Sequence, residues 1–192
     1  GEGTSCRYEN FEKNKAEIRA EIRKRENNSK NALKSLGINL YSFYDLPCGR
    51  LNSLPIIEIN KIVEKNIKLF KPNIIFTHSE KDCNNDHRVI FRSVSMATRP
   101  TLKHKVEQIF SFEILSSSEW NYSEQFNPNY FEVLKKRDID AKWRALRFYK
   151  TEVQKHPKPR SREGIFTLAK YRGLQTGVEY AEAFKLIRKF KN

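Results

Sequence analysis

An amphipathic helical pattern leads directly into a short apolar strand near the middle of this chain. Over residues 54–70 the apolar positions fall on one helical face, and Pro72 ends the run. Residues 73–77 then read Asn-Ile-Ile-Phe-Thr, a pattern typical of a strand in the buried interior of a parallel sheet. This succession predicts an open α/β sheet with right-handed crossovers.

The rest of the chain continues the alternation of strands and helices. Residues 9–36 predict a charged helix that ends at Gly37, and the alternating residues 38–43 predict a strand. Helices are also predicted at residues 89–97, 139–153 and 162–171, the last closed by Gly173, with a strand at 106–114 and a polar loop at 116–129. There is no internal repeat and no linker long enough to separate domains, so we expect a single domain over residues 1–192.

Composition excludes several classes of protein. The longest apolar runs are only a few residues, and no charged region precedes an apolar one at the N-terminus, which argues against a membrane span or a signal peptide. We therefore expect a cytoplasmic protein. The cysteines are odd in number and lack C-x-x-C spacing, which argues against a disulfide framework or a thiolate zinc site: Cys6, Cys48 and Cys83.

Most of the formal net charge of +14 lies near the C-terminus, because residues 135–192 hold 17 Lys+Arg against 6 Asp+Glu. Such a stretch attracts anions such as nucleic acid, phosphorylated sugars or an anionic lipid surface. A solvated helical surface is the alternative, since apolar residues recur among the charges. Zinc-finger spacing, aromatic RNA-binding motifs and GXXG loops are absent, so we expect no specific nucleic-acid partner.

The segment 77–88 gathers metal-type ligands where the predicted strand ends. It holds two imidazoles, two aspartates and two asparagines in twelve residues. Reactive groups in open α/β sheets collect at this carboxyl edge. His87 is the best ligand candidate, because an imidazole in the first turn of a helix is held rigidly. The alternative is a surface histidine beside Asp86 that merely caps the helix, and the spacing leaves both open.

Several motifs together resemble one family. The central ones are Thr77-His78-Ser79, Asp82, Asn84, Asp86-His87-Arg88 and Ala97-Thr98-Arg99-Pro100. Others follow in order on both sides: Arg25-Glu26, Leu36-Gly37, Leu46-Pro47, Phe112-Glu113, Phe126-Asn127-Pro128-Asn129, His156-Pro157, Pro159-Arg160-Ser161 and Arg172-Gly173. The pattern resembles the PIG-L/LmbE-like zinc-dependent N-deacetylases of the sugar-cluster type. The resemblance implies a Rossmann-like, three-layer open α/β sheet that is mostly parallel.

This resemblance implies hydrolysis of the N-acetyl group of an N-acetylated sugar or sugar conjugate. The family holds one zinc with two residues of an N-terminal His-Pro-Asp-Asp-Glu motif and with a histidine that matches His87. That motif does not occur in the 192 residues. We therefore expect the domain to be N-terminally truncated, with the first strand, the other zinc ligands and the general base in the absent segment. This chain alone would then be inactive.

The resemblance also implies roles for individual residues. His156 matches the acid that protonates the departing amine, although Lys158-Pro159 interrupts the family's His-Pro-Arg-Ser pattern. Asp86 would orient its neighbours in catalysis. The expected substrate-binding residues are Arg25, Asn84 and Arg160. A surface histidine and solvated arginines are the plainer alternatives.

Three functions remain open at this stage. The leading one is a zinc-dependent N-deacetylase whose substrate is a sugar phosphate or a nucleotide- or lipid-linked sugar, in view of the basic C-terminal stretch. The second is a non-catalytic or vestigial sugar-binding member of the same fold. The third is a basic nucleic-acid-binding protein. The sequence also leaves peripheral membrane contact and oligomerisation open.

Overall fold

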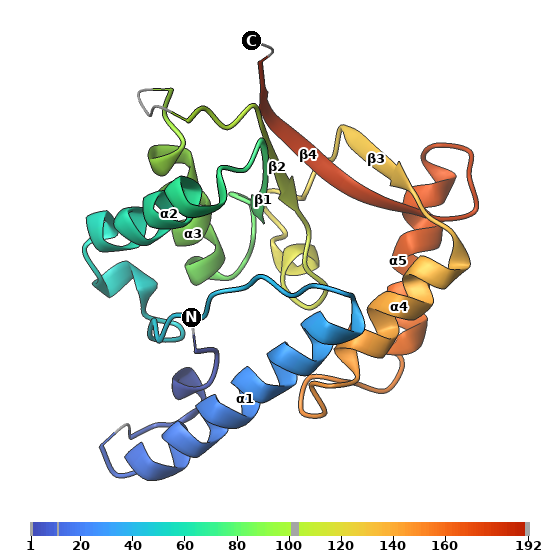
Figure 1. Ribbon diagram of the computed structural model, residues 1–192. Coiled ribbons are helices and arrows are strands. Elements are labelled where there is room, and N and C mark those ends of the chain that lie inside the picture. The colour runs from blue at the N-terminus through green and yellow to red at the C-terminus, as the bar shows by residue number, and fades with distance from the viewer. Residues whose placement is uncertain (1, 11, 101–103, 191–192) are drawn as a thin grey trace. The chain divides into compact units, whose positions relative to one another are not determined.

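The computed structural model describes residues 2–10, 12–100 and 104–190, and it divides into two compact units (Figure 1). The first unit comprises Gly1–Leu51 and Val133–Ala181, and the second comprises Asn52–Glu132 and Glu182–Asn192. Gly1, the residue at which the chain opens, lies outside the described residues. The expectation of a single domain over 1–192 stays a prediction.

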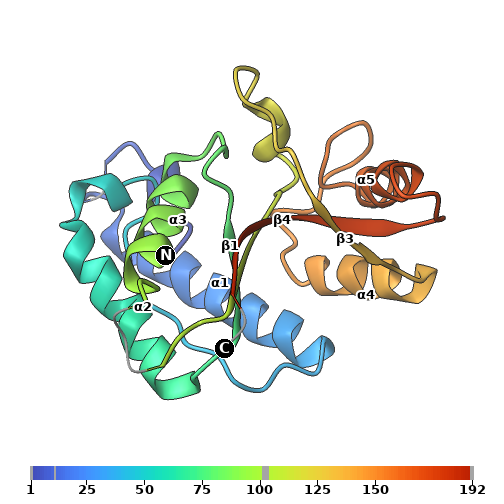
Figure 2. The ribbon, with the colours of Figure 1, turned by 90° about the horizontal axis from the view of Figure 1, so that it is seen from above.

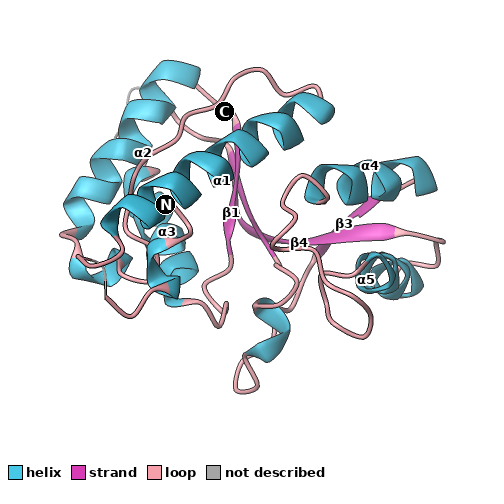
Figure 3. Ribbon diagram, turned by 90° about the horizontal axis from the view of Figure 1, so that it is seen from below, coloured by secondary structure: helices cyan, strands magenta, loops and turns pink. Residues whose placement is uncertain are grey.

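A four-stranded open sheet lies almost entirely in the second unit, and its order is β1-β2-β4-β3 (Figure 3). The strands are β1 (Ile74–His78), β2 (Gln108–Phe112), β3 (Tyr130–Val133) and β4 (Ala181–Lys189). β1 runs parallel to β2, with His78 opposite Phe112, whereas β2 and β4 are antiparallel. The predicted open α/β sheet is confirmed, and its pairing is mixed.

Helices α2 (Ile56–Phe70) and α3 (Asn85–Ala97) pack together beside β1 and β2 (Figure 2). The core between them and the sheet consists of Ile67, Ala97, Val106 and Ile109, each at most 3% exposed. The spacing of apolar residues along one helical face predicts both helices. Burial of these apolar faces is what fixes the helices on the sheet.

An aromatic cluster occupies the strands of the same sheet. The ring of Phe76 stacks on Phe110 with centroids 5.2 Å apart and meets Phe184 edge-on at 5.1 Å, while Tyr130 lies 4.9 Å from Phe110. Phe110 is buried, but Phe76 on β1 is 52% exposed.

Residues 73–77 were predicted as a strand in the buried interior of the sheet. The strand is present, but it is not buried. Among the described strands, β1 pairs only with β2, and it therefore forms an edge of the sheet. Its continuous apolar sequence is typical of a strand with neighbours on both sides, whereas Ile74 is 43% exposed.

The first unit is helical, with α1 (Lys15–Ser35), α4 (Lys136–Leu146) and α5 (Arg162–Leu174). Helix α4 contacts both α1 and α5 (Figure 1). Ile18 and Ile139 are buried on the first two of these helices, at 1% exposure each. A short 3₁₀ turn at Ser5–Arg7 precedes α1.

Three local predictions for the first unit need correction. Residues 38–43 form no strand, and their side chains include Leu40 at 78% exposure. Helix α4 ends at Leu146 rather than at residue 153. Helix α5 runs through Gly173 to Leu174 instead of stopping there. The glycine permits a close approach of the chain, since a Cβ would lie 2.5 Å from the carbonyl oxygen of Val178.

The helices in the described part of the chain can be compared with the requirements for crossing a membrane. None of them combines the length and the apolar character that a transmembrane span requires.

Candidate functional site

The ligand-rich segment 77–88 folds into a tight turn between β1 and α3. Asn84 is the N-cap of α3, and its side-chain oxygen accepts a hydrogen bond from the backbone N–H of Asp86 at 2.9 Å. The capping role that the sequence allowed for Asp86 therefore belongs to Asn84. Both residues lie within one helical turn of His87, so the structure brings these three predicted site residues together.

Asp82 is the carboxylate that faces His87. Its side chain is fully buried and accepts hydrogen bonds from the hydroxyls of Ser117 and Ser118 and from the backbone N–H of Asn84. Nδ1 of His87 lies 3.0 Å from Oδ1 of Asp82. Burial raises the pKa of Asp82, but the His87 ring and the Ser117 hydroxyl lower it by more, to about 2. Asp82 is therefore an anion that lies at ion-pair distance from the imidazole, although Nδ1 makes no hydrogen bond of good geometry to a described residue.

The other ring nitrogen of His87 is turned away from this carboxylate. Nε2 lies 3.4 Å from the side-chain nitrogen of Asn84, and the His87 side chain is 20% exposed. A metal-ligating histidine usually has a carboxylate on one ring nitrogen and the metal on the other, and here the other nitrogen, Nε2, contacts the amide of Asn84, which a metal would displace. The carboxylate in contact with His87 is that of Asp82, and the expected orienting role of Asp86 stays a prediction.

His78 lies directly against His87 at the end of β1. The two rings are stacked, with centroids 4.3 Å apart. Burial, followed by the charge of His87, lowers the pKa of His78 to about 4, so this imidazole is neutral at physiological pH. Its Nδ1 is buried and makes no hydrogen bond to another described residue.

The side chains of this turn could supply one zinc ligand, His87, but they do not form a complete zinc site. Zinc in a catalytic centre takes three protein ligands. Among the described residues, no group of three or more His, Cys, Asp and Glu side chains is arranged to hold a metal ion. Of the predicted site, the structure thus shows one oriented imidazole.

A second cluster lies in the first unit, where three arginines meet one buried carboxylate. Nη1 of Arg25 lies 2.6 Å from Oε1 of Glu152, and the guanidinium groups of Arg7 and Arg160 also contact this carboxylate. Burial raises the pKa of Glu152, but the hydrogen bonds from Arg7 and Arg25 outweigh it and hold the pKa at about 2. Three cations therefore surround a single anion.

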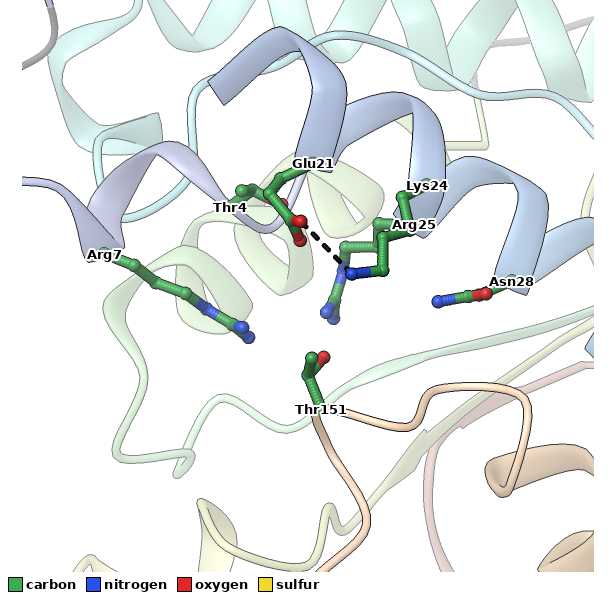
Figure 4. A pocket seen from close by; sticks show the side chains of 7 residues that line it. All are labelled: Thr4, Arg7, Glu21, Lys24, Arg25, Asn28 and Thr151. Carbon is green, nitrogen blue, oxygen red and sulfur yellow. Dashed lines mark hydrogen bonds and ion pairs between the residues drawn. The ribbon is translucent and has the colours of Figure 1, made fainter. Parts of the chain in front are cut away.

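A shallow pocket opens beside this cluster (Figure 4). The side chains of Arg7 and Arg25 point into it towards Thr151, and Lys24 is paired with Glu21 at its rim. The pocket is lined by Thr4, Arg7, Glu21, Lys24, Arg25, Asn28 and Thr151. Paired guanidinium groups of this kind suit a phosphate or carboxylate ligand.

The predicted site residues thus fall into two groups. Arg25 and Arg160 meet at Glu152 in the first unit, where His156 is exposed in the loop between α4 and α5. Asn84, Asp86 and His87 form the turn in the second unit. Sequence reasoning gave no role to three residues that hold these groups: Arg7, Asp82 and Glu152. Only Asp82 carried a signal, through its place in the ligand-rich segment.

Comparisons with known proteins agree with this fold. A conserved protein TT1542 from Thermus thermophilus has a TM-score of 0.70 at 21% identity, covering 88% of this chain and 76% of that one. The N,N'-diacetylchitobiose deacetylase from Pyrococcus horikoshii has a TM-score of 0.65 at 18% identity, covering 87% and 64%. GalB, the 4-carboxy-2-hydroxymuconate hydratase from Pseudomonas putida KT2440, has a TM-score of 0.63 at 18% identity, covering 91% and 76%.

At these identities the structural likeness establishes the fold alone, and the two named enzymes perform different reactions on it. No curated protein sequence matches the chain. The family model described as PIG-L: GlcNAc-PI de-N-acetylase matches residues 3–98, which is half of the chain and includes the His87 turn. The chain therefore belongs to the PIG-L family.

Proposed function

We propose that this protein is a zinc-dependent N-deacetylase that removes the acetyl group from an anionic N-acetylated sugar conjugate. The observation that carries the proposal is the His87 imidazole oriented by the buried Asp82 carboxylate, within the segment matched by a family described as a GlcNAc-PI de-N-acetylase. Structural likeness to a deacetylase that acts on a chitobiose derivative supports it.

His87 would contribute one ligand to the zinc through Nε2, with Asp82 holding the ring in place. Zinc, when bound, supplies a Lewis acid for the acetamide carbonyl and lowers the pKa of its water. The described residues do not complete a ligand set, so the proposal requires further zinc ligands besides His87.

Proton transfer and positioning fall to different residues in this proposal. An amine leaves an amide only as the protonated species, and we assign the donation of that proton to His156, which is exposed to solvent. Asp86 and Asn84, at the start of α3 beside His87, would orient the reacting groups and contact the sugar.

The arginine cluster would recognise the anionic part of the substrate. Arg7, Arg25 and Arg160 share one buried carboxylate, so their charge is only partly compensated. A phosphate group offers acceptor oxygens that match guanidinium forks. We therefore expect a sugar phosphate to bind more tightly than the same sugar without its phosphate.

The test measures binding and acetate release on the same protein. N-acetylglucosamine 1-phosphate and N-acetylglucosamine are titrated by calorimetry, and acetate release is followed with zinc present on a protein that also supplies the further zinc ligands. Arg25→Ala should weaken binding of the phosphorylated sugar about tenfold or more, the effect of losing one charged hydrogen bond. Arg19→Ala, an exposed residue on the same helix, is the control and should bind like the parent chain.

His87→Ala should abolish any zinc-dependent acetate release, whereas His104→Ala, whose Nε2 contacts the carbonyl of Pro72, should not. Phosphosugar binding without acetate release by a protein that also supplies the further zinc ligands would instead support the non-catalytic sugar-binding function. Steeply salt-dependent RNA binding with no response to either sugar would support the nucleic-acid-binding function and contradict the proposal.

A further inference from the structure

Two cysteines that are distant in sequence face each other in the first unit. Sγ of Cys6 lies 2.8 Å from Sγ of Cys48, although 42 positions separate them. Both are free thiols, Cys6 exposed and Cys48 half-buried. A disulfide bond brings two sulfurs to about 2 Å. Only a small shift of these side chains therefore separates the thiol pair from a bond.

The surrounding backbone holds the two thiols in place. Gly49 has a φ of +71°, and a Cβ at this position would lie 3.0 Å from the Cβ of Cys6, so the glycine permits the close approach. The carboxylate of Glu2 accepts hydrogen bonds from the backbone N–H groups of Cys48, at 2.7 Å, and of Ser5, at 2.9 Å. One carboxylate thus joins both segments that carry the cysteines.

The two thiols differ in their surroundings. Burial, followed by the contact with Cys6, raises the pKa of Cys48 to about 12, so Cys48 is the poorer of the two thiols as the first attacking nucleophile. Cys6 is exposed and is therefore the sulfur that an external reagent reaches.

We propose that Cys6 and Cys48 form a reversible intramolecular disulfide by exchange with a small disulfide of the glutathione type. The thiolate of Cys6 attacks one sulfur of glutathione disulfide, and the first glutathione leaves as a thiolate. Cys48 then loses its proton to solvent and attacks Sγ of Cys6, which expels the second glutathione. The protein dithiol is oxidised by two electrons, and glutathione disulfide is reduced to two glutathione molecules.

We expect oxidation to stabilise the first unit against unfolding. The new bond would tie the turn at Ser5–Arg7 to the loop at residues 46–49 and would close a long loop in the unfolded chain. We expect the oxidised chain to melt at least ~5 °C higher than the reduced chain, and dithiothreitol to reverse the shift.

The experiment uses the full chain carrying Cys83→Ser, so that only the two paired thiols remain. After incubation with glutathione disulfide, alkylation and mass spectrometry should find neither cysteine modified, the mass lowered by two hydrogens, and one peptide cross-linked between the two positions. Cys48→Ser should instead retain glutathione on Cys6, because the resolving thiol is gone.

Three results would overturn the proposal. These are a stable glutathione adduct on Cys6 in the chain that keeps Cys48, a disulfide-linked dimer on a non-reducing gel, and equal melting temperatures for oxidised and reduced chains. The first two results are measured on the chain that keeps both thiols. They therefore remain a valid test even if the Cys48→Ser variant folds poorly.

Discussion

Two buried carboxylates organise the candidate chemistry at the residue scale. Asp82 fixes the His87 imidazole, and Glu152 gathers three arginines. The sequence could point to Asp82, because it lies five residues before His87 in the ligand-rich segment. It could not point to Glu152, since its partners Arg7 and Arg25 lie 145 and 127 positions away and only the tertiary fold unites them.

Replacing Glu152 by Gln should lower the free energy of unfolding by about 3 kcal/mol at pH 7, because the folded-state pKa of about 2 lies well below the ordinary value of 4.5. A lowered folded-state pKa stabilises the protein fully above pH 4.5, and this stabilisation disappears as the pH falls towards 2. Urea unfolding at pH 7 and at pH 3 should therefore show a difference between the two chains that shrinks in acid.

Glu9→Gln supplies the control for that measurement, because Glu9 is exposed in the same unit. It should unfold like the parent chain at both pH values. A loss for Glu152→Gln that stays constant from pH 7 to pH 3 would show that the side chain acts through packing rather than through its charge.

At the scale of the element, periodic apolar faces predicted the helices well and the strands less well. Helices α2 and α3 were found within a few residues, because each buries one face on the sheet. Strands β3 and β4 were not predicted. The sequence of β4, Ala-Glu-Ala-Phe-Lys-Leu-Ile-Arg-Lys, is short of β-branched residues, and its pairing with β2 rests on contacts that local pattern does not encode.

The start of α5 gives an element-scale prediction. Ser161 is buried, and its hydroxyl accepts a hydrogen bond from the backbone N–H of Gly164 at 3.0 Å. Ser161→Ala should lower the free energy of unfolding by about 1 kcal/mol, the usual value of an N-cap. Thr167→Ala, an exposed change inside the same helix, should be neutral or slightly stabilising. Equal unfolding midpoints for Ser161→Ala and the parent chain in chemical denaturation would refute the assignment of the cap.

At the scale of the whole molecule, the open edge of the sheet should govern self-association. Among the described strands β1 has a neighbour on one side only, and Ile74 and Phe76 on it are exposed. An unprotected apolar edge is a template for pairing with another chain. Ile74→Lys should therefore reduce concentration-dependent association, measured by light scattering after size-exclusion chromatography.

Leu69→Lys is the matched control, because Leu69 is 67% exposed on α2 and lies outside the sheet. It should leave association unchanged. If both lysines reduce association equally, general surface hydrophobicity rather than the strand edge drives it.

The three guanidinium groups around Glu152 also bear on how the purified protein behaves in different buffers. One carboxylate neutralises one of the three, so two like charges remain crowded together and repel. If the cluster binds anions as proposed, dissolved multivalent anions should relieve that repulsion by mass action, even when no sugar is present. Melting curves recorded in phosphate or sulfate and those recorded in a chloride medium would then describe differently liganded states, and the choice of salt becomes an experimental variable in its own right.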